Sequence, residues 1–246
     1  DRVISTVDPD TRHAHKSVQR RQDGFKAHLA IEPDTGIITD CVLTKASGSE
    51  NHEAVVGLKL LENEDTPVRV LGDSAYGTGT ARAALAEAGH VAVIKPLPLR
   101  TPVPGGFTSD DFTIDFQART VTCPAHHTVV IRPSGGATFE KYCRSCPLAS
   151  QCTTAVRGRK LTLSIHEQSL RAARVLARHP DWQAEYRQHR PMVERSIAWL
   201  TRGNRKVRYR GIAKNDRWLH HRAAALNLRR LLAMGLTHSG STWVLA

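Results

Sequence analysis

Apolar and polar residues alternate in two neighbouring segments near the start of the chain, as in strands that bury one face. In residues 24–32 every second position from Phe25 to Ile31 is apolar, and Lys26 and His28 lie between them. The turn sequence Pro33-Asp34-Thr35-Gly36 follows, and residues 37–44 form the expected returning strand. The pattern predicts an antiparallel hairpin.

The next fifty residues predict alternating helices and strands. Asn51 can cap a helix through about Glu62, and a short apolar run follows at 68–71. An alanine-rich segment, 80–88, predicts a helix closed by Gly89, and residues 91–94 predict another strand. The order β-β-α-β-α-β indicates a mixed α/β sheet.

The pattern changes after residue 95. Prolines and a glycine pair give residues 96–106 the composition of a linker. Residues 101–165 predict a separate β-rich insert with short strands at 112–116, 120–122, 128–131 and 160–163, and they hold four of the five cysteines. Helices are expected at 170–178, 182–189, 191–200 and 216–234, with Pro191 starting one of them. The expected α/β core is therefore split into 1–100 and 166–235, followed by a loose tail at 236–246.

The charge balance points to a polyanionic partner. Lys and Arg number 35 against 23 Asp and Glu, a formal net charge of +12, and the pI is about 10.0. Such a surplus suits nucleic acid, although an ordinary basic protein has the same composition. The 40% apolar content excludes a wholly disordered chain, and no apolar run is long enough for a membrane helix. The first residue is not Met, so we expect a fragment of a longer protein.

Asp73 is the first candidate for chemistry. It ends the apolar strand in VRVLGDSAYGTG, and α/β sheets place reactive groups where strands end. Gly72 and Gly77 allow a sharp turn beside it. The alternative is an aspartate that caps the following helix.

Glu194 is the second candidate. Tyr186, Arg190 and Glu194 follow at four-residue steps, which places them on one helical stripe. With a helix start at Pro191, Glu194 would lie in the first turn, where the helix dipole favours a carboxylate. Residues 187–230 hold thirteen Lys and Arg but two acids, with three aromatic residues between them. Glu194 is then either a ligand for a hard cation or the ion-pair partner of Arg190 or Arg195.

The spacing Cys123-x19-Cys143-x2-Cys146-x5-Cys152 supplies four possible zinc ligands. It resembles a zinc ribbon, with His126 and His127 as possible substitutes. Buried thiols or disulfides are the alternatives. Cys41 lies within a predicted strand and is expected to be a small core residue.

Taken together, VLGDSAYGTG, the cysteine segment, YRQHRPMVER and RYRGIAKNDRWLHHRAAALNLRRLL resemble the catalytic region of bacterial insertion-sequence DDE transposases. The resemblance implies an RNase H-like fold in which three acids bind two Mg²⁺ or Mn²⁺ ions, with Asp73 as the second acid and Glu194 as the third. It implies nicking at element ends and strand transfer by the freed 3′-OH. The partners would be terminal-repeat and target DNA, and the active form a homodimer in the bacterial cytoplasm, at the nucleoid. Many relatives carry a lysine after the glutamate, and here Thr201 and Arg202 stand nearby.

Two questions stay open at this stage. The first acid is either Asp8, in STVDPDTR, or a residue upstream of the chain. The chain is either a transposase, a non-catalytic DNA-binding remnant of one, or a zinc-ribbon nucleic-acid module without an enzyme site. In each case the expected phosphate contacts are Arg190, Arg195, Arg202, Arg205, Lys206, Arg208 and Arg210.

Overall fold

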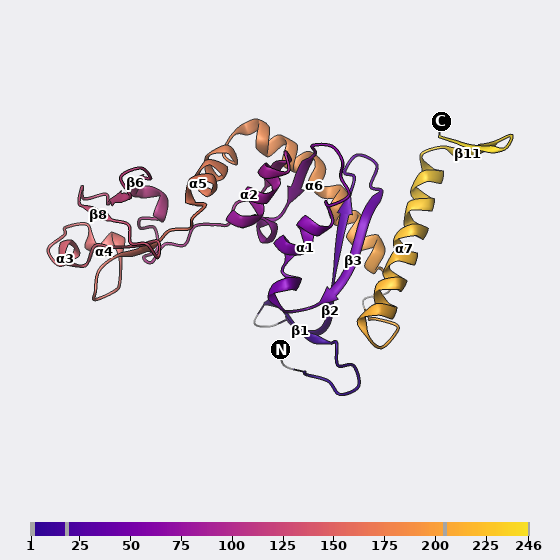
Figure 1. The fold of residues 1–246 in the computed structure, drawn as a ribbon, viewed down its shortest axis with the longest axis horizontal. Helices are drawn as coiled ribbons and strands as arrows, with labels where there is room; N and C mark the ends of the chain where they lie inside the picture. The colour runs from indigo at the N-terminus through magenta and orange to yellow at the C-terminus, as the bar shows by residue number, and fades with distance from the viewer. Residues whose placement is uncertain (1–2, 18–19, 204–205, 246) are drawn as a thin grey trace.

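The computed structural model describes residues 3–17, 20–203 and 206–245 (Figure 1). A mixed α/β core occupies the middle of the molecule. The cysteine-bearing insert lies at one end, and a long C-terminal helix with a small hairpin lies at the other (Figure 1). The expected mixed α/β class is therefore confirmed.

The first sheet contains β1 (Arg12–Ser17), β2 (Arg20–Ile31) and β3 (Ile38–Lys45) in the antiparallel order β1-β2-β3. The register of β2 with β3 runs from Phe25 opposite Lys45 to Ile31 opposite Ile38. Gly36 takes a φ of 74° in the connecting turn. The predicted hairpin is confirmed, and its first strand begins earlier than the alternation indicated.

A βαβ unit follows. Helix α1 (Glu53–Lys59) leads to β4 (Arg69–Gly72), α2 (Gly79–Glu87) and β5 (Val91–Ile94), and β4 pairs with β5 in parallel. His52, not Asn51, caps α1 by accepting from the Ala54 amide. Within the described residues no strand pairing joins β4 and β5 to the first sheet, so they form two sheets. The single sheet expected of an RNase H-like fold is not formed there.

Helix α6 (Pro180–Thr201) corrects the sequence prediction, because it is one continuous helix with Pro191 inside it. The proline that starts a helix is Pro180, at the first helical position. Tertiary contacts are made on both sides of Pro191. His189 Nδ1 lies 3.4 Å from Asp34 Oδ1, and the Met192 side chain packs on Gly36. These contacts with the β2–β3 turn hold the helix together despite the missing amide hydrogen.

Helix α5 (Glu167–Leu176) precedes α6, and α7 (Ile212–Ala233) lies along the outer side of β3 (Figure 1). Leu219 and Ala223 of α7 bury against Ile38 and Cys41 of β3 and Leu200 of α6. Cys41 is thus a core residue, as predicted.

Polar side chains of α7 also bond to the edge strand β3. Asn227 accepts from the Ile38 amide at 2.9 Å and donates to the Ile38 carbonyl at 2.8 Å. Asp216 accepts from the Leu43 amide at 2.7 Å. These bonds satisfy backbone groups on the side of β3 where no other strand of the described chain pairs with it.

The insert has short elements and its own core. Strands β6 (Thr113–Asp115), β7 (Thr120–Thr122) and β8 (Thr128–Val130) form one antiparallel sheet, and β9 (Gly136–Thr138) pairs with β10 (Lys160–Thr162). Helices α3 (Glu140–Cys143) and α4 (Ala149–Cys152) lie between β9 and β10. The sequence did not predict β9, α3 or α4. The buried cluster of the insert comprises Phe112, Val121, Ala137, Phe139, Cys152, Leu161 and Leu163.

The chain ends in a hairpin of β11 (Leu236–Ser239) and β12 (Thr242–Leu245), not in a loose tail. Gly240 supplies a positive φ of 63° in its turn. No helix in the described part of the chain has the length and hydropathy needed to cross a bilayer.

Candidate active site and nucleic-acid interface

Asp73 lies directly after β4, half-buried, at the start of the short 3-10 helix Ser74–Tyr76. Its Oδ1 accepts from the Ala75 amide at 2.9 Å. The capping role considered for Asp73 is therefore real. One carboxylate oxygen is enough for this bond, so capping does not prevent Asp73 from binding a ligand through the other.

Tyr76 lies in the loop that contains Asp73, and its side chain packs against Gly57 of α1 and Gly72 of β4. Its ring lies so close to α1 that a Cβ on Gly57 would come 2.8 Å from Tyr76 Cδ1. Burial raises the pKa of Tyr76 to about 12, and the negative charges of Asp73 and Glu53 act in the same direction. The phenol therefore stays neutral at physiological pH.

Arg82 of α2 fixes the other side of the loop that contains Asp73. It is 8% exposed, and its Nη2 donates to the Ile94 carbonyl at 2.6 Å. Its Nε donates to the Gly77 carbonyl at 3.3 Å. Burial lowers the pKa of Arg82. The sequence analysis did not single out Arg82, since its only signal was a charged residue in an alanine-rich helix.

Glu194 lies in the middle of α6, not in its first turn, and its side chain is 63% exposed. Its Oε1 accepts from Arg190 Nε at 3.0 Å and Nη2 at 2.8 Å. Arg190 also donates to the Tyr186 hydroxyl at 3.0 Å. The predicted stripe of three side chains is confirmed, and so is the ion pair of Glu194 with Arg190.

Contacts between β4 and α6 bring Asp73 toward this stripe. Arg69, at the start of β4, donates to both carboxylate oxygens of Glu185 on α6. From this pair, four strand residues advance about 13 Å to Asp73, and nine helical residues advance about the same distance to Glu194. The two acids therefore come level if β4 and α6 run in the same direction.

The electrostatics of Arg190 support that direction. Burial acts to lower the pKa of Arg190, but its hydrogen bond to Glu194 and the charges of Tyr186, Glu194 and Asp73 raise that pKa above the ordinary value. Asp73 is thus close enough to act on the guanidinium that Glu194 binds. Glu194 forms the ion pair with this guanidinium, whereas Asp73, 121 positions earlier in the sequence, acts on it through its charge alone.

Asp8 lies elsewhere, at the start of α7. Its Oδ2 accepts from the Gly211 amide at 3.1 Å, and Asp10 accepts from the Ile212 amide at 3.0 Å. Both therefore satisfy free amides and the dipole of that helix. Among the residues that the structure describes, no three His, Cys, Asp or Glu side chains are arranged to hold a metal ion. Asp8 does not join Asp73 and Glu194.

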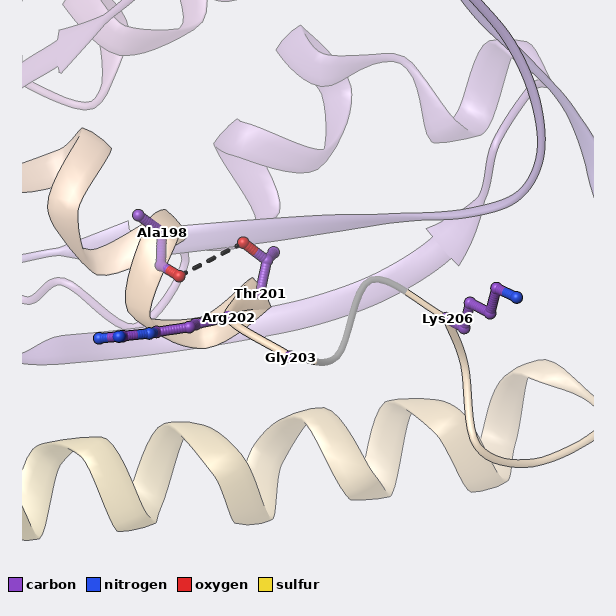
Figure 2. A pocket seen from close by; sticks show the side chains of 5 residues that line it. All are labelled: Ala198, Thr201, Arg202, Gly203 and Lys206. Atoms are coloured by element: carbon purple, nitrogen blue, oxygen red, sulfur yellow. Dashed lines mark hydrogen bonds between the residues drawn. The ribbon is translucent and has the colours of Figure 1, made fainter.

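An open hollow of about 600 Å³ lies at the C-terminal end of α6. Figure 2 shows its lining residues, in which the Arg202 and Lys206 side chains extend toward opposite ends. Thr201 closes the helix by donating to the Ile197 carbonyl at 2.9 Å. Two cations beside an open hollow suit an anionic group such as a phosphate.

The side chains of the expected phosphate contacts differ in their exposure to solvent. Arg195, Arg202, Lys206, Arg208 and Arg210 are exposed, whereas Arg190 is partly buried in its pair with Glu194. Arg205 lies outside the described residues.

The loop that carries Arg208 and Arg210 is held by a residue that the sequence analysis missed. Asn215 is 1% exposed and bonds to the Tyr209 amide and carbonyl and to the Gly211 carbonyl. Two other cations of this region serve the fold: Arg222 donates to the Leu200 carbonyl, and Arg230 to the Thr35 carbonyl.

The four insert cysteines line a single cavity, together with Arg159 and aromatic side chains. All of them are free thiols, and within the described part of the chain no three of them are arranged to hold a metal ion. Burial raises the pKa of Cys152, and the other three cysteines add to that effect.

Comparisons with known proteins gave one match. Residues 122–232 match the family model described as a transposase DDE domain. The match includes all four insert cysteines, Glu194 and most of α7, and Asp73 lies outside it. No curated protein and no solved structure matches the chain.

Proposed function

We propose that this chain, whose residues 122–232 match the transposase DDE domain model, is a DDE transposase that nicks DNA and transfers strands, with Asp73 and Glu194 binding a divalent cation. The observation that carries the proposal is the double hydrogen bond of Arg69 to Glu185, which joins β4, the strand before Asp73, to α6, the helix that carries Glu194. On that helix Arg190 forms an ion pair with Glu194.

The donor set suits a hard divalent ion. Mg²⁺ and Mn²⁺ prefer carboxylate oxygens, and Mg²⁺ often uses one or two carboxylates, with water and substrate phosphate as its other ligands. Two acids are therefore compatible with binding, although the family resemblance implies three. When bound, such an ion neutralises the phosphodiester and activates the attacking water or 3′-OH.

The residues around the acids have separate tasks. Arg82 and Tyr76 fix the loop that presents Asp73. Arg190 neutralises Glu194 in the structure described here and is released to contact a DNA phosphate when Glu194 turns to another cation. The exposed cations from Arg195 to Arg210 hold the DNA backbone beside the acids, so binding weakens steeply with salt.

The remaining parts of the proposal follow from the resemblance. They are recognition of terminal-repeat and target DNA, a homodimer as the active form, and action at the bacterial nucleoid. Analytical ultracentrifugation with and without a DNA duplex tests the dimer.

Nicking of supercoiled plasmid DNA in Mg²⁺ or Mn²⁺ tests the chemistry. We expect the wild-type chain to nick the plasmid. Nicking by Asp73→Asn and Glu194→Gln should fall to background, because each substitution replaces a charged carboxylate ligand of the cation with a neutral amide. Asp65→Asn and Glu87→Gln remove equivalent charges from exposed positions away from the site and should nick normally. Equal nicking by Asp73→Asn and wild type would exclude the proposed role of Asp73.

A non-catalytic DNA-binding protein is the alternative. It is favoured by the lack of a third acid beside Asp73 and Glu194 among the described residues. In that case the wild-type chain binds duplex DNA with a steep salt dependence and never nicks it. Substitution of Arg202 and Lys206 would then weaken binding, and substitution of the acids would not.

A further inference from the structure

The insert holds the second cluster of chemically capable side chains in the molecule. We propose that it binds one structural Zn²⁺ ion through four thiolates, those of Cys123, Cys143, Cys146 and Cys152. The proposal does not depend on the function of the core, since it concerns contacts within residues 101–165.

The cavity has the size and lining of such a site. The four cysteines come from β7's end, α3, the turn after it and α4, yet all line one cavity of about 20 Å³. That volume is about the room of one water-sized sphere. Much of the remaining lining is aromatic, including Phe112, Phe139 and Tyr142. Among the described residues the four sulfurs are not yet arranged as a coordination shell, so the proposal requires the thiols to turn toward the cavity centre to reach the Zn–S distance of about 2.3 Å.

Tight turns present the thiols. The Cys123 carbonyl accepts from the His126 amide at 2.9 Å, and His126 takes a φ of 61°. The Cys143 carbonyl accepts from the Cys146 amide at 3.4 Å. Backbone hydrogen bonds therefore hold the turns that carry Cys123, Cys143 and Cys146.

A backbone amide already donates to one of the sulfurs. The Arg159 amide lies 3.4 Å from Cys143 Sγ. Gly158, with a φ of 75°, makes this approach possible, because a Cβ there would lie 2.8 Å from the Cys143 Cβ. Hydrogen bonds to ligand atoms orient them and stabilise their charged form.

Arg159 supplies an independent indication of negative charge. It is 6% exposed, lines the cavity, and its Nε has no hydrogen-bond partner. Its Nη1 donates to the Cys152 carbonyl at 3.2 Å. No described acidic side chain forms an ion pair with it, and an unpaired buried charge is strongly unfavourable. Four thiolates around Zn²⁺ carry a net charge of −2, which Arg159 would partly neutralise.

The insert is small enough to need a bound ion for its stability. Its strands have three residues each and its helices four, and seven buried residues form its core. Domains below about 70–80 residues seldom reach useful stability from such a core without a disulfide or a metal. The cysteines form no disulfide here.

Metal analysis of the whole 246-residue chain tests the proposal. The protein is expressed with zinc in the medium, purified without chelator and analysed by mass spectrometry for metals. We expect one zinc per chain, and Co²⁺ replacement should give thiolate-to-cobalt charge-transfer absorption. Cys146→Ser should lose the metal, whereas Cys41→Ala, at the one cysteine outside the cavity, should keep it.

Two results would overturn the proposal. One is a wild-type chain that contains no zinc and gives no cobalt charge-transfer band. The other is equal zinc loss in Cys41→Ala and Cys146→Ser. Should Cys146→Ser fail to fold, the wild-type protein decides: removal of zinc must make four thiols newly reactive toward a thiol reagent. A failure here leaves the nicking experiment unaffected.

Discussion

The core and the insert are stabilised by contacts of very different range. In the core, Asn227 bonds to Ile38 and Asp8 to Gly211, across 189 and 203 positions of sequence. In the insert, Phe112, Phe139 and Leu161 pack within one short stretch of chain. The acids of the core meet only when distant segments have docked, whereas the thiols of the insert can assemble locally.

The two sites therefore depend on different packing contacts. The Asp73–Glu194 face depends on the packing of α6 against β4 and the β2–β3 turn. The cysteine cavity depends on a small core of its own. An ion-pair cluster connects the two regions: Arg174 of α5 binds Asp110 of the insert and Glu167 of α5, both at close range.

The largest effect is expected from separate truncations of the two cores. Phe139→Ala should remove about 3–5 kcal/mol from the insert, and Leu219→Ala about 2–5 kcal/mol from the core. Hydrogen exchange should show lost amide protection only in the region that carries each substitution. Loss of protection everywhere in both variants would mean that the two regions unfold as one unit.

The connection between the regions gives the next effect. Arg174→Met should cost about 3 kcal/mol, because it removes the nearer of two cations from the poorly exposed carboxylates of Asp110 and Glu167 and leaves them only the longer ion pairs with Arg171. Limited proteolysis in residues 96–106 should then accelerate. Arg144→Met is the matched control, since its pair with Glu140 is largely exposed and weak. Unchanged cleavage in Arg174→Met would contradict a role in holding the insert.

A substitution within α6 should strengthen the core. Pro191→Ala restores an amide donor inside the helix and removes a steric conflict, a gain of up to about 3 kcal/mol. The urea midpoint of the core should rise, while that of the insert stays the same. Pro180→Ala, at the first helical position, should give no such gain. A lower midpoint for Pro191→Ala would show that the proline ring itself is needed for packing.

The smallest effect is a dependence of core stability on pH. His28 is 2% exposed and bonds to Thr44, and burial lowers its pKa. In the unfolded chain His28 binds a proton near pH 6.5, whereas in the folded core it does so only at lower pH. The free energy of unfolding of the core therefore falls as the pH drops below about 6.5. Urea unfolding from pH 7.5 to 5.5 should show the fall, and His28→Gln should reduce it. An unchanged slope in His28→Gln would assign the effect to other histidines.

Sequence reasoning succeeded where neighbouring residues decide the outcome. The alternation from Phe25 to Ile31 predicted β2, and the four-residue steps from Tyr186 to Glu194 predicted the stripe on α6. It was wrong at Pro191, because contacts of His189 and Met192 with a distant turn outweigh the local preference of proline. It also missed Arg82 and Asn215, whose partners are backbone groups that no residue pattern reveals.

By itself, the sequence determined most of the strands and helices and the chemical types available: two acids, four thiols and a surplus of arginine. These depend on residue identity and on contacts a few positions apart. Only the tertiary structure decided that Arg69 of β4 bonds to Glu185 of α6, that Asp8 caps α7 and that the four thiols share a cavity with Arg159. Most of these relations join residues many positions apart, and packing and charge, not local preference, determine which of them meet.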